Sequence, residues 1–263
     1  MEIVLEKVNF TNKVFNTQIL EDINLNIKTG LITTIVGASG SGKTTLAEII
    51  DLLVIPSSGN VKYNSKNKVG LVFQNPEEQF FASTVEKEIE FGLNYLNKDI
   101  YKIKKKVQDA LIMVNLNPNY LNRNPFSLSC GEKRKVAIAS VLAFNPEIII
   151  LDEPTLGLDK KSKKSLIKII KLLKNRYNKT IIVITKDTEL AHIISDEVVV
   201  LNDGKIVLQG NKYEVFTEDI SKYGLKKPKI IEFEQLVYKE KNIKLLYRDD
   251  INDLMKDVYR NVK

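Results

Sequence analysis

The fold is decided by the stretch Gly37-Ala38-Ser39-Gly40-Ser41-Gly42-Lys43-Thr44, which matches the pattern G-x-x-x-x-G-K-[ST]. A β-branched run at residues 31–36 predicts a strand before it, and residues 45–53, beginning with Thr45, predict a helix after it. Glycines let the backbone approach phosphate oxygens, and loop and helix N–H groups hold an anion. We expect Lys43 to reach the β- and γ-phosphates and Thr44 to bind Mg²⁺. This phosphate loop, residues 37–44, therefore predicts a nucleoside triphosphate site.

A second candidate element is the carboxyl pair Asp152-Glu153, which ends the apolar run Ile148–Leu151. Such a run predicts a buried strand, and the carboxyl ends of parallel strands face the ligand crevice of an α/β sheet. Asp152 is therefore a candidate Mg²⁺ ligand, and Glu153 a candidate general base for the attacking water. Alone, the pair would be an ordinary strand end. Beside the phosphate loop it predicts hydrolysis of the bound triphosphate.

Strand and helix patterns alternate along most of the chain. Strand patterns also occupy 3–10, 23–27, 60–63, 69–73, 180–185, 198–201 and 205–208, and a helix pattern occupies 161–175. Residues 75–145 are helical instead. Ser83 and Glu86 have capping-box spacing before a helix at 84–96, and a second helix follows Asp99 with one apolar face, formed by Ile103, Val107, Ala110, Leu111 and Val114. After residue 210 the pattern is lysine-rich and helical to the end. The sequence predicts an α/β fold with an antiparallel β portion, an inserted helical subdomain at 75–145 and a C-terminal helical extension at 213–263.

Composition narrows the class of protein. The chain has 263 residues, 43% hydrophobic and 28% charged, which suits one substantial core and excludes a mainly disordered state. No run of about 18 apolar residues is present, so no membrane-spanning helix is predicted. The single cysteine suits a reducing, intracellular compartment. The net charge of +7 comes from lysines in mixed-sign segments without interleaved aromatics, so it does not predict a nucleic-acid partner.

Three further motifs give the chain a family resemblance. Leu128-Ser129-Cys130-Gly131-Glu132 is similar to the signature segment of ATP-binding cassette (ABC) ATPases, Val72-Phe73-Gln74 resembles their Q-loop, and Asp152-Glu153-Pro154-Thr155 with Leu158-Asp159 resembles Walker B and the D-loop. With the phosphate loop they stand in family order, and the resemblance to the family covers roughly residues 1–212. The resemblance implies a P-loop NTPase fold and a head-to-tail pair of such domains with two ATP molecules between them. It also implies that Gln74 touches Mg²⁺ or the lytic water, and that Ser129 and Gly131 contact the ATP held by the partner.

One branch of this family is closer than the others. The segment from Phe73 to Phe80, then 84–86 and Phe91-Gly92-Leu93, and in the tail 215–216, 224–225 and Pro228, are similar to the ATPase subunits of energy-coupling factor (ECF) transporters. That resemblance implies an importer of vitamins or metal ions. Its partners would be a second ATPase subunit, an integral-membrane scaffold and a small substrate-binding membrane subunit. The chain would then lie peripherally at the cytoplasmic face of the membrane, with residues 1–212 as its ATPase domain.

Three positions depart from the family pattern. Lys186 follows the strand at 180–185, where the family has a histidine. As a candidate catalytic residue, lysine can still pair with the γ-phosphate as a cation, but it cannot accept a proton as imidazole does. Asn12 stands where an adenine-stacking aromatic is expected, with Phe15 as a possible substitute and Phe10 interpreted as core. Cys130 replaces the first signature glycine. Because these changes fall on different composite sites, we expect a heterodimer with unequal sites rather than a homodimer. The only histidine, His192, is interpreted as structural.

Other readings stay open at this level. A cassette ATPase of DNA repair is disfavoured, because only 152 − 43 = 109 positions separate Lys43 from Asp152 and no heptad run intervenes. The ATPase of another importer class, or a catalytically weak regulatory ATP-binding subunit, remains an alternative. The transported substrate is not encoded here, because a different polypeptide selects it.

Overall fold

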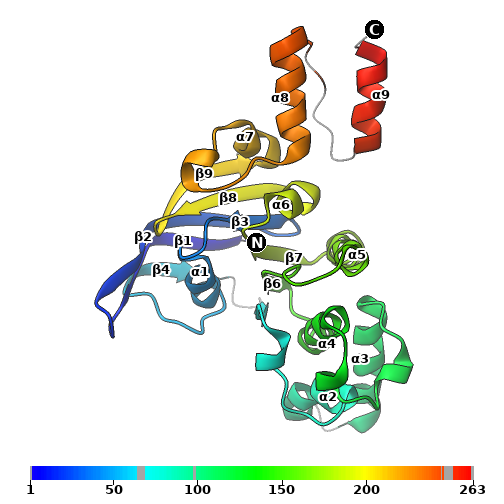
Figure 1. The fold of residues 1–263 in the computed structure, drawn as a ribbon. Helices are drawn as coiled ribbons and strands as arrows, with labels where there is room; N and C mark the ends of the chain where they lie inside the picture. Colours follow the sequence, from blue (N-terminus) through cyan, green and yellow to red (C-terminus); the bar gives the residue numbers. More distant parts are fainter. Residues whose placement is uncertain (1, 64–68, 97–98, 244, 246–250, 262–263) are drawn as a thin grey trace.

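The computed structural model describes residues 2–63, 69–96, 99–243, 245 and 251–261. Within these residues the strands form a smaller and a larger sheet (Figure 1). The smaller sheet is antiparallel, with the order β2-β1-β4, and is formed by β1 (Glu2–Asn12), β2 (Thr17–Lys28) and β4 (Ser58–Lys62). Its inward side chains share one apolar cluster with helix α1 (Lys43–Ile50). This sheet is the antiparallel portion that the sequence predicts.

The larger sheet has the strand order β5-β6-β7-β3-β8-β9. Its strands are β3 (Ile32–Val36), β5 (Val69–Val72), β6 (Ile148–Asp152), β7 (Thr180–Thr185), β8 (Glu197–Asn202) and β9 (Lys205–Asn211). The pairings are parallel except that of β9 with β8. Every residue of β3, β6 and β7 is buried, as expected for strands covered on both faces.

The register of the central strands positions the functional residues. Val36 at the end of β3 pairs with Thr185 at the end of β7, and Asp152 at the end of β6 pairs with Ile184. The carboxyl ends of these three strands therefore reach the same edge of the sheet. The phosphate loop begins one residue after Val36, so it starts beside Asp152 and Thr185.

Helix α1 is shorter than the sequence predicts. It begins at Lys43 and ends at Ile50, whereas the apolar pattern predicts a helix as far as residue 53. Asp51 caps the helix, and Leu52 has φ +63°, in the left-handed region that an α-helix does not continue through. The prediction for α5 (Lys160–Tyr177) is close, since the expected range was 161–175. Helix α6 (Thr188–Ile194) begins three residues after the end of β7, with Asp187 as its N-cap.

The inserted helices lie at the foot of the molecule, below both sheets (Figure 1). They are α2 (Val85–Leu96), α3 (Ile100–Met113) and α4 (Cys130–Ala143). The 3-10 turn η1 (Pro76–Glu78) precedes α2, and the turns η2 (Pro118–Tyr120) and η3 (Pro125–Ser127) lie between α3 and α4. The predicted apolar face of α3 is buried, which confirms the helical pattern. The prediction that Ser83 and Glu86 form a capping box is wrong. Helix α2 begins one residue later than that spacing implies, and Thr84 Oγ1 accepts a hydrogen bond from Lys87 N (3.3 Å).

The C-terminal part consists of α7 (Lys212–Thr217), α8 (Lys229–Lys241) and α9 (Ile251–Asn261). Helices α8 and α9 stand side by side at the end of the molecule opposite the inserted helices (Figure 1). The prediction that the chain is helical from residue 210 to its end is wrong for residues 218–228. The stretch 218–228, described in full, contains the 3-10 turn η4 (Ser221–Tyr223) in place of an α-helix and ends at Pro228 before α8.

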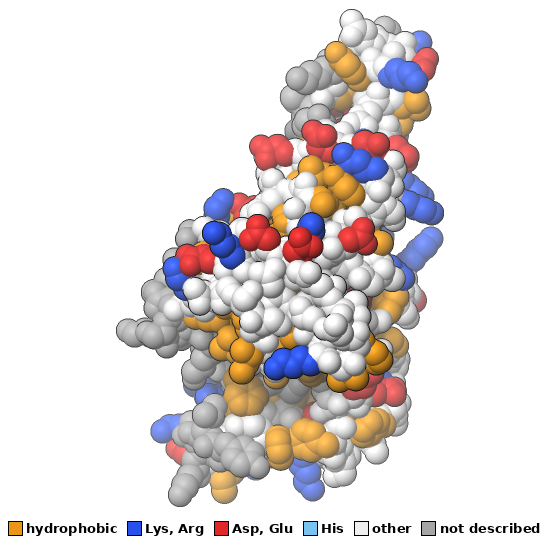
Figure 2. Space-filling model, turned by 90° about the vertical axis from the view of Figure 1, so that its left-hand side faces the viewer, with side chains coloured by type: hydrophobic (Ala, Val, Ile, Leu, Met, Phe, Trp, Pro, Cys, Tyr) orange, Lys and Arg blue, Asp and Glu red, His pale blue; other side chains and the backbone are white. Residues whose placement is uncertain are grey.

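The surface charge is mixed on the face shown in Figure 2, where acidic and basic side chains lie interspersed across the upper and middle parts of the molecule. No helix in the described ranges is long and apolar enough to cross a lipid bilayer.

Candidate functional site

The phosphate loop has a conformation that its glycines permit. A Cβ built on Gly37 would lie 2.3 Å from the carbonyl oxygen of Leu201, so the loop approaches β8 too closely for any side chain. Gly42 has φ +97°, and a Cβ there would lie 2.8 Å from Leu20 Cδ2. Only glycine permits the close approach at position 37 and the positive φ at position 42 without displacing a neighbour. Ser39 and the following glycine form the exposed crest of the loop, which leaves its backbone open to a ligand.

Lys43 lies beneath this loop and spans it. Its ammonium donates hydrogen bonds to the Ala38 carbonyl (2.7 Å) and to Ser41 Oγ (3.3 Å). Burial lowers the pKa of Lys43, while the carboxylates of Glu153 and Asp152 act to raise it. The cation is therefore held next to both acidic side chains that the sequence singles out.

Thr44 and Asp152 meet as a pair of oxygen donors. Thr44 Oγ1 donates a hydrogen bond of 3.0 Å to Asp152 Oδ2. Asp152 is 3% exposed, and its second oxygen, Oδ1, is buried without a hydrogen-bond partner in the described part of the chain. Burial raises the pKa of Asp152, and the Thr44 hydrogen bond partly opposes this. A desolvated carboxylate oxygen beside a hydroxyl fits a hard divalent cation such as Mg²⁺. Thr45, the next residue of α1, is half-buried.

Glu153 is fixed by the last residues of β7 and by Lys186, which follows that strand. Its backbone has φ +39°, and its N–H donates to the Ile184 carbonyl (2.8 Å). One carboxylate oxygen accepts from Thr185 Oγ1 (2.8 Å), and the other accepts from Lys186 N (2.9 Å). An unusual backbone conformation held by neighbouring groups is common at functional sites. The two bonds direct the carboxylate along the edge of the sheet.

A cavity of about 1140 Å³ lies beside Glu153 and the first residues of the phosphate loop, whereas Lys43, Thr44 and Asp152 are not among its described lining residues. Its walls are Ala38 and Ser39 of the phosphate loop, Glu153 with the residues after β6, residues 186–189 after β7, and residues between 219 and 235 of the C-terminal extension. The Lys186 side chain is exposed, and its charge contributes to lowering the pKa of Lys43. Together with the strand register, this cavity shows that the predicted phosphate loop, Asp152, Glu153 and Lys186 lie at one edge of the sheet.

Gln74 borders a different cavity, of about 530 Å³, with Cys130 and Arg134. Its side chain is exposed two residues beyond β5, at the sheet edge that also carries Asp152. Leu156 and Gly157 line both cavities, so the two spaces adjoin. Gln74 is thus near the phosphate-loop cavity but is not one of its lining residues.

The signature segment begins α4 with the cap that its sequence predicts. Ser129 Oγ accepts from Glu132 N (3.4 Å), and Ser129 N donates to Glu132 Oε2 (2.9 Å), which confirms the capping box. Gly131 also serves the packing of its own chain, because a Cβ there would lie 2.7 Å from Ser162 Oγ of α5. Cys130 is exposed beside Gly157. Ser129, Cys130 and Gly131 are all absent from the described lining of the phosphate-loop cavity.

Two functional neighbours were missed by sequence reasoning. Thr185 holds Glu153, and its one sequence signal is a polar residue at the end of an apolar strand. Arg134 is 2% exposed within α4, and its Nη1 donates to the Phe73 carbonyl (2.9 Å) just before Gln74. Arg134 stands in the charged run Glu132-Lys133-Arg134-Lys135, so no local pattern distinguishes this buried cation from its charged neighbours.

The departures from the family pattern occupy distinct places. Asn12 ends β1, and its Oδ1 accepts from Val14 N (2.9 Å) in the following turn. Phe15 is 76% exposed in that turn, whereas Phe10 packs against the core, as the sequence indicates. His192 is 1% exposed within α6, which agrees with a structural role.

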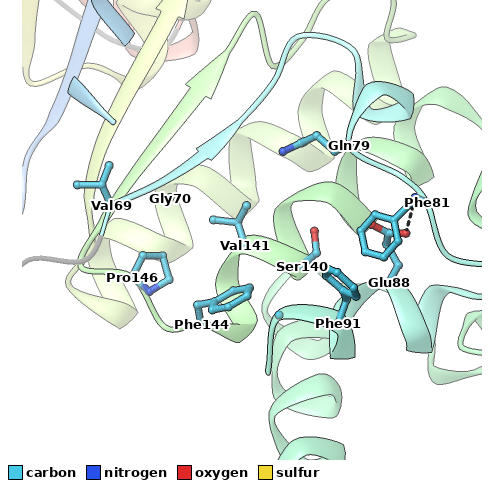
Figure 3. A pocket seen from close by; sticks show the side chains of 11 residues that line it. Val69, Gly70, Gln79, Phe81, Glu88, Phe91, Ser140, Val141, Phe144 and Pro146 are labelled. Atoms are coloured by element: carbon cyan, nitrogen blue, oxygen red, sulfur yellow. Dashed lines mark hydrogen bonds between the residues drawn. The ribbon is translucent and has the colours of Figure 1, made fainter. Parts of the chain in front are cut away.

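An apolar groove of about 740 Å³ lies between the edge strand β5 and the inserted helices (Figure 3). The rings of Phe81 and Phe91 meet edge to face at one end, 4.2 Å apart between centroids. Glu88 lines the groove and is 5% exposed, and its Oε2 accepts from Phe81 N (3.1 Å) and Ala82 N (2.9 Å). A Cβ on Gly92 would lie 1.7 Å from Phe144 Cζ. The groove therefore combines an apolar lining with one buried carboxylate.

Comparison with known proteins identifies the family. The ABC transporter model matches residues 20–156. Energy-coupling factor transporter ATP-binding protein EcfA2 of Clostridium perfringens is 39% identical over 249 residues, which are 88% of this chain and 87% of that protein. EcfA2 of Enterococcus faecalis is 41% identical over 236 residues, which are 83% of this chain and 82% of that protein.

Solved structures agree with the same assignment. The cbiO1 protein of Clostridium perfringens, described as part of the ABC transporter complex cbiONQ, superposes with a TM-score of 0.76 at 33% identity, covering 89% of this chain and 98% of that one. A dimeric ATP-binding cassette bound to ADP and Pi superposes with a TM-score of 0.72 at 30% identity, covering 80% and 98%. With the phosphate loop, Asp152 and Glu153 on one sheet edge, this chain belongs to the ABC transporter family, and within it to the ATP-binding proteins of energy-coupling factor transporters.

Proposed function

We propose that this chain is one of two ATPase subunits that energise an ECF-type importer of vitamins or metal ions. The observation that carries the proposal is the register of β3, β6 and β7, which sets the phosphate loop, Asp152 and Glu153 side by side. Residues 1–212 would form the ATPase domain, residues 75–145 its inserted arm, and residues 213–263 an extension.

The phosphates of ATP would lie against the N–H groups of residues 37–45, with Lys43 adding positive charge at the β- and γ-phosphates. Mg²⁺ would be held by Thr44 and Asp152, with Gln74 approaching from the end of β5. When bound, it would offset phosphate charge. The partnerless Oδ1 of Asp152 supports this donor set.

Glu153 would act as the general base. Its carboxylate accepts a proton from the attacking water as the water oxygen bonds to the γ-phosphorus and the bond to the bridging oxygen breaks. The hydrogen bonds from Thr185 and Lys186 support this role, because they fix the carboxylate before substrate arrives. Lys186 would add a positive charge near the γ-phosphate, but it cannot take over proton transfer while it is protonated.

The second ATPase subunit would complete the site. The start of α4, capped by Ser129, presents N–H groups to an anion, but Ser129 and Gly131 do not line this chain's own phosphate-loop cavity among the described residues. The signature segment is therefore available to the ATP of a partner. We propose a heterodimer, because Asn12 and Lys186 would weaken this chain's own site while Cys130 would change the site completed in the partner.

The apolar groove in Figure 3 is the proposed docking site of the membrane scaffold. Its lining fits the apolar face of a short helix, and the buried carboxylate of Glu88 would pair with a basic side chain on that helix. The chain would then lie at the cytoplasmic face of the membrane, below the scaffold and a small substrate-binding membrane subunit.

The test is ATP hydrolysis by the reconstituted complex with and without Glu153→Gln. We expect phosphate release by the complex, and a fall when Glu153 is replaced. We call the part of the ATPase rate that is lost on this substitution the Glu153-dependent hydrolysis. Glu240→Gln, on the exposed side of α8, is the matched control and should leave the rate unchanged. No phosphate release, or equal rates in all three complexes, would contradict the proposed ATPase role. If Glu153→Gln lowers the rate of phosphate release as much as the equivalent substitution in the second ATPase does, only the proposal that the two ATP sites are unequal would be contradicted.

A further inference from the structure

The stretch 218–228 of the C-terminal extension lies against the phosphate loop. A Cβ built on Gly224, whose φ is +71°, would lie 3.6 Å from Ala38 Cβ. The next residue, Leu225, is buried in an apolar cluster that includes Val36, the last residue of β3 before the loop. The close approach at Gly224 and the shared apolar cluster join the segment 218–228 to the nucleotide site. The extension is therefore one wall of the cavity that holds Glu153 and Lys186.

The same extension is hydrogen-bonded to the residues that follow Lys186. Thr188 Oγ1 donates to the Lys226 carbonyl (2.6 Å), and Glu189 Oε1 accepts from Lys229 N at the start of α8 (2.9 Å). Thr188 is 5% exposed, so its hydroxyl bond is shielded from water. These two bonds fix the start of α6 to the extension.

The start of α6 is in turn linked to the catalytic carboxylate. Thr185 Oγ1 and Lys186 N both donate to Glu153, and Asp187 N donates to Thr185 Oγ1 (3.0 Å). Asp187 also forms an ion pair with Lys163 of α5. Residues 185–189, which we name the switch segment, thus contact Glu153 at one end and the extension at the other.

We propose that the C-terminal extension is a positioning element for hydrolysis, acting on Glu153 through the switch segment. The inference rests on the proposed ATPase function and adds to it a role for residues 218–229. Thr188 and Glu189 are positioning residues, because each acts through the backbone that carries Lys186. Loss of their bonds lets the switch segment shift, and the Glu153 carboxylate shifts with it. Thr188 and Glu189 line the cavity, but neither belongs to the phosphate loop or to the Thr44–Asp152 pair, so we expect the effect on turnover and not on ATP affinity.

The test compares Thr188→Val with Thr188→Ser in the reconstituted complex. Valine keeps the size and removes the hydroxyl, whereas serine keeps the hydroxyl. We expect Thr188→Val to lower kcat for Glu153-dependent hydrolysis by about tenfold, with KM and the nucleotide Kd changed less than about twofold. Thr188→Ser should restore most of the turnover. The control is Thr217→Val, because Thr217 Oγ1 also donates to backbone carbonyls in the extension, those of Tyr213 and Glu214, without touching the switch segment.

A second pair of variants covers the case in which Thr188→Val does not fold. Glu189→Ala removes the acceptor for Lys229 N, and Glu189→Gln retains an acceptor oxygen. We expect the same kcat loss for alanine and recovery for glutamine. Wild-type kcat in both Thr188→Val and Glu189→Ala, or a loss no larger than that of Thr217→Val, would overturn the inference and leave the ATPase function standing. A wild-type complex without Glu153-dependent hydrolysis would overturn the proposed function and this inference with it.

Discussion

Thr44 Oγ1 and Asp152 Oδ2 are joined by a hydrogen bond of 3.0 Å, although 108 positions separate the two residues. The bond connects the first turn of α1 to the end of β6, so the two halves of the site share one contact. It also leaves Asp152 Oδ1 as a buried oxygen without a hydrogen-bond partner among the described residues. A buried polar atom of this kind costs free energy unless a ligand satisfies it. The pair therefore constitutes a preformed place for a cation.

The first prediction concerns Asp152→Asn. The substitution keeps the shape and an oxygen for Thr44 but removes the negative charge that a divalent cation requires. We expect wild-type protein to bind ATP at least about tenfold more tightly with Mg²⁺ than with a chelator, and Asp152→Asn to bind equally in both conditions. Titration calorimetry measures both affinities. Asp109→Asn, exposed on α3, is the control and should behave as wild type. A full Mg²⁺ effect in Asp152→Asn would exclude Asp152 as the ligand.

The second prediction concerns Gly92 in helix α2. An alanine Cβ would lie 1.7 Å from Phe144 Cζ, so the ring must move out of its packed position. Overpacking of this kind costs about 1–3 kcal/mol of unfolding free energy. We expect Gly92→Ala to lower Tm, and the double substitution with Phe144→Leu to recover part of the loss. Thermal unfolding of the single and double variants measures both effects. Strictly additive losses would show that the two side chains do not meet.

The third prediction uses Asp51, which caps α1. Burial raises the pKa of Asp51 to about 6. The folded protein therefore binds more protons at this group than the unfolded chain does between roughly pH 4 and 6, and the stabilisation present at low pH is lost as the pH rises through this range. At about pH 7.5 the charged, partly buried Asp51 destabilises the fold, after solvent screening by about 1 kcal/mol.

Asp51→Asn tests this sign, because it removes the charge and keeps the shape. We expect the variant to exceed wild type in unfolding free energy at about pH 7.5 and to approach it near pH 5, where Asp51 is mostly protonated in the folded state. Denaturant unfolding at both values is the measurement. A variant that is less stable than wild type at the higher pH would show that the charged carboxylate is stabilising.

The fourth prediction concerns docking at the apolar groove. Glu88→Gln retains an oxygen for the N–H groups of Phe81 and Ala82 but removes the buried charge. If a basic side chain of the scaffold pairs with Glu88, affinity for the scaffold should fall by about tenfold, since one partner of a buried pair is then left uncompensated. Glu90→Gln is the control, because Glu90 lies on the same helix outside the groove. Equal affinity of Glu88→Gln and wild type for the scaffold would contradict the proposed pairing of Glu88 with a basic side chain.

The parts of this site that could be predicted from the sequence are those in which the functional residues are neighbours along the chain. The phosphate loop lies within eight residues flanked by a strand and a helix, and Asp152-Glu153 directly end an apolar strand. Local chemistry therefore identified them, and the parallel register placed them together. The signature cap at Ser129 was likewise predictable, because donor and acceptor stand three residues apart.

The parts that escaped prediction depend on packing between distant segments. The extension meets the switch segment through Thr188 and Lys226, 38 positions apart, and neither residue has a local pattern that signals the bond. The cap of α2 is Thr84 and not the predicted Ser83 for a related reason. Val85 N donates to the Arg123 carbonyl, so a contact outside the helix helps set where α2 begins. Tertiary contacts of this kind cannot be deduced from spacing alone.

The fifth prediction concerns the cation at position 186. Lys186→His keeps the backbone N–H that donates to Glu153 Oε1, since that bond does not involve the side chain. It replaces a cation by an imidazole that is mostly neutral at about pH 7.5 and can both donate and accept a hydrogen bond. We expect Glu153-dependent hydrolysis to rise about threefold or more, because the water can then be oriented by a second acceptor. Lys186→Arg keeps the charge and should give no gain. A fall with histidine as large as that with Lys186→Ala would instead assign the function at this position to the lysine charge.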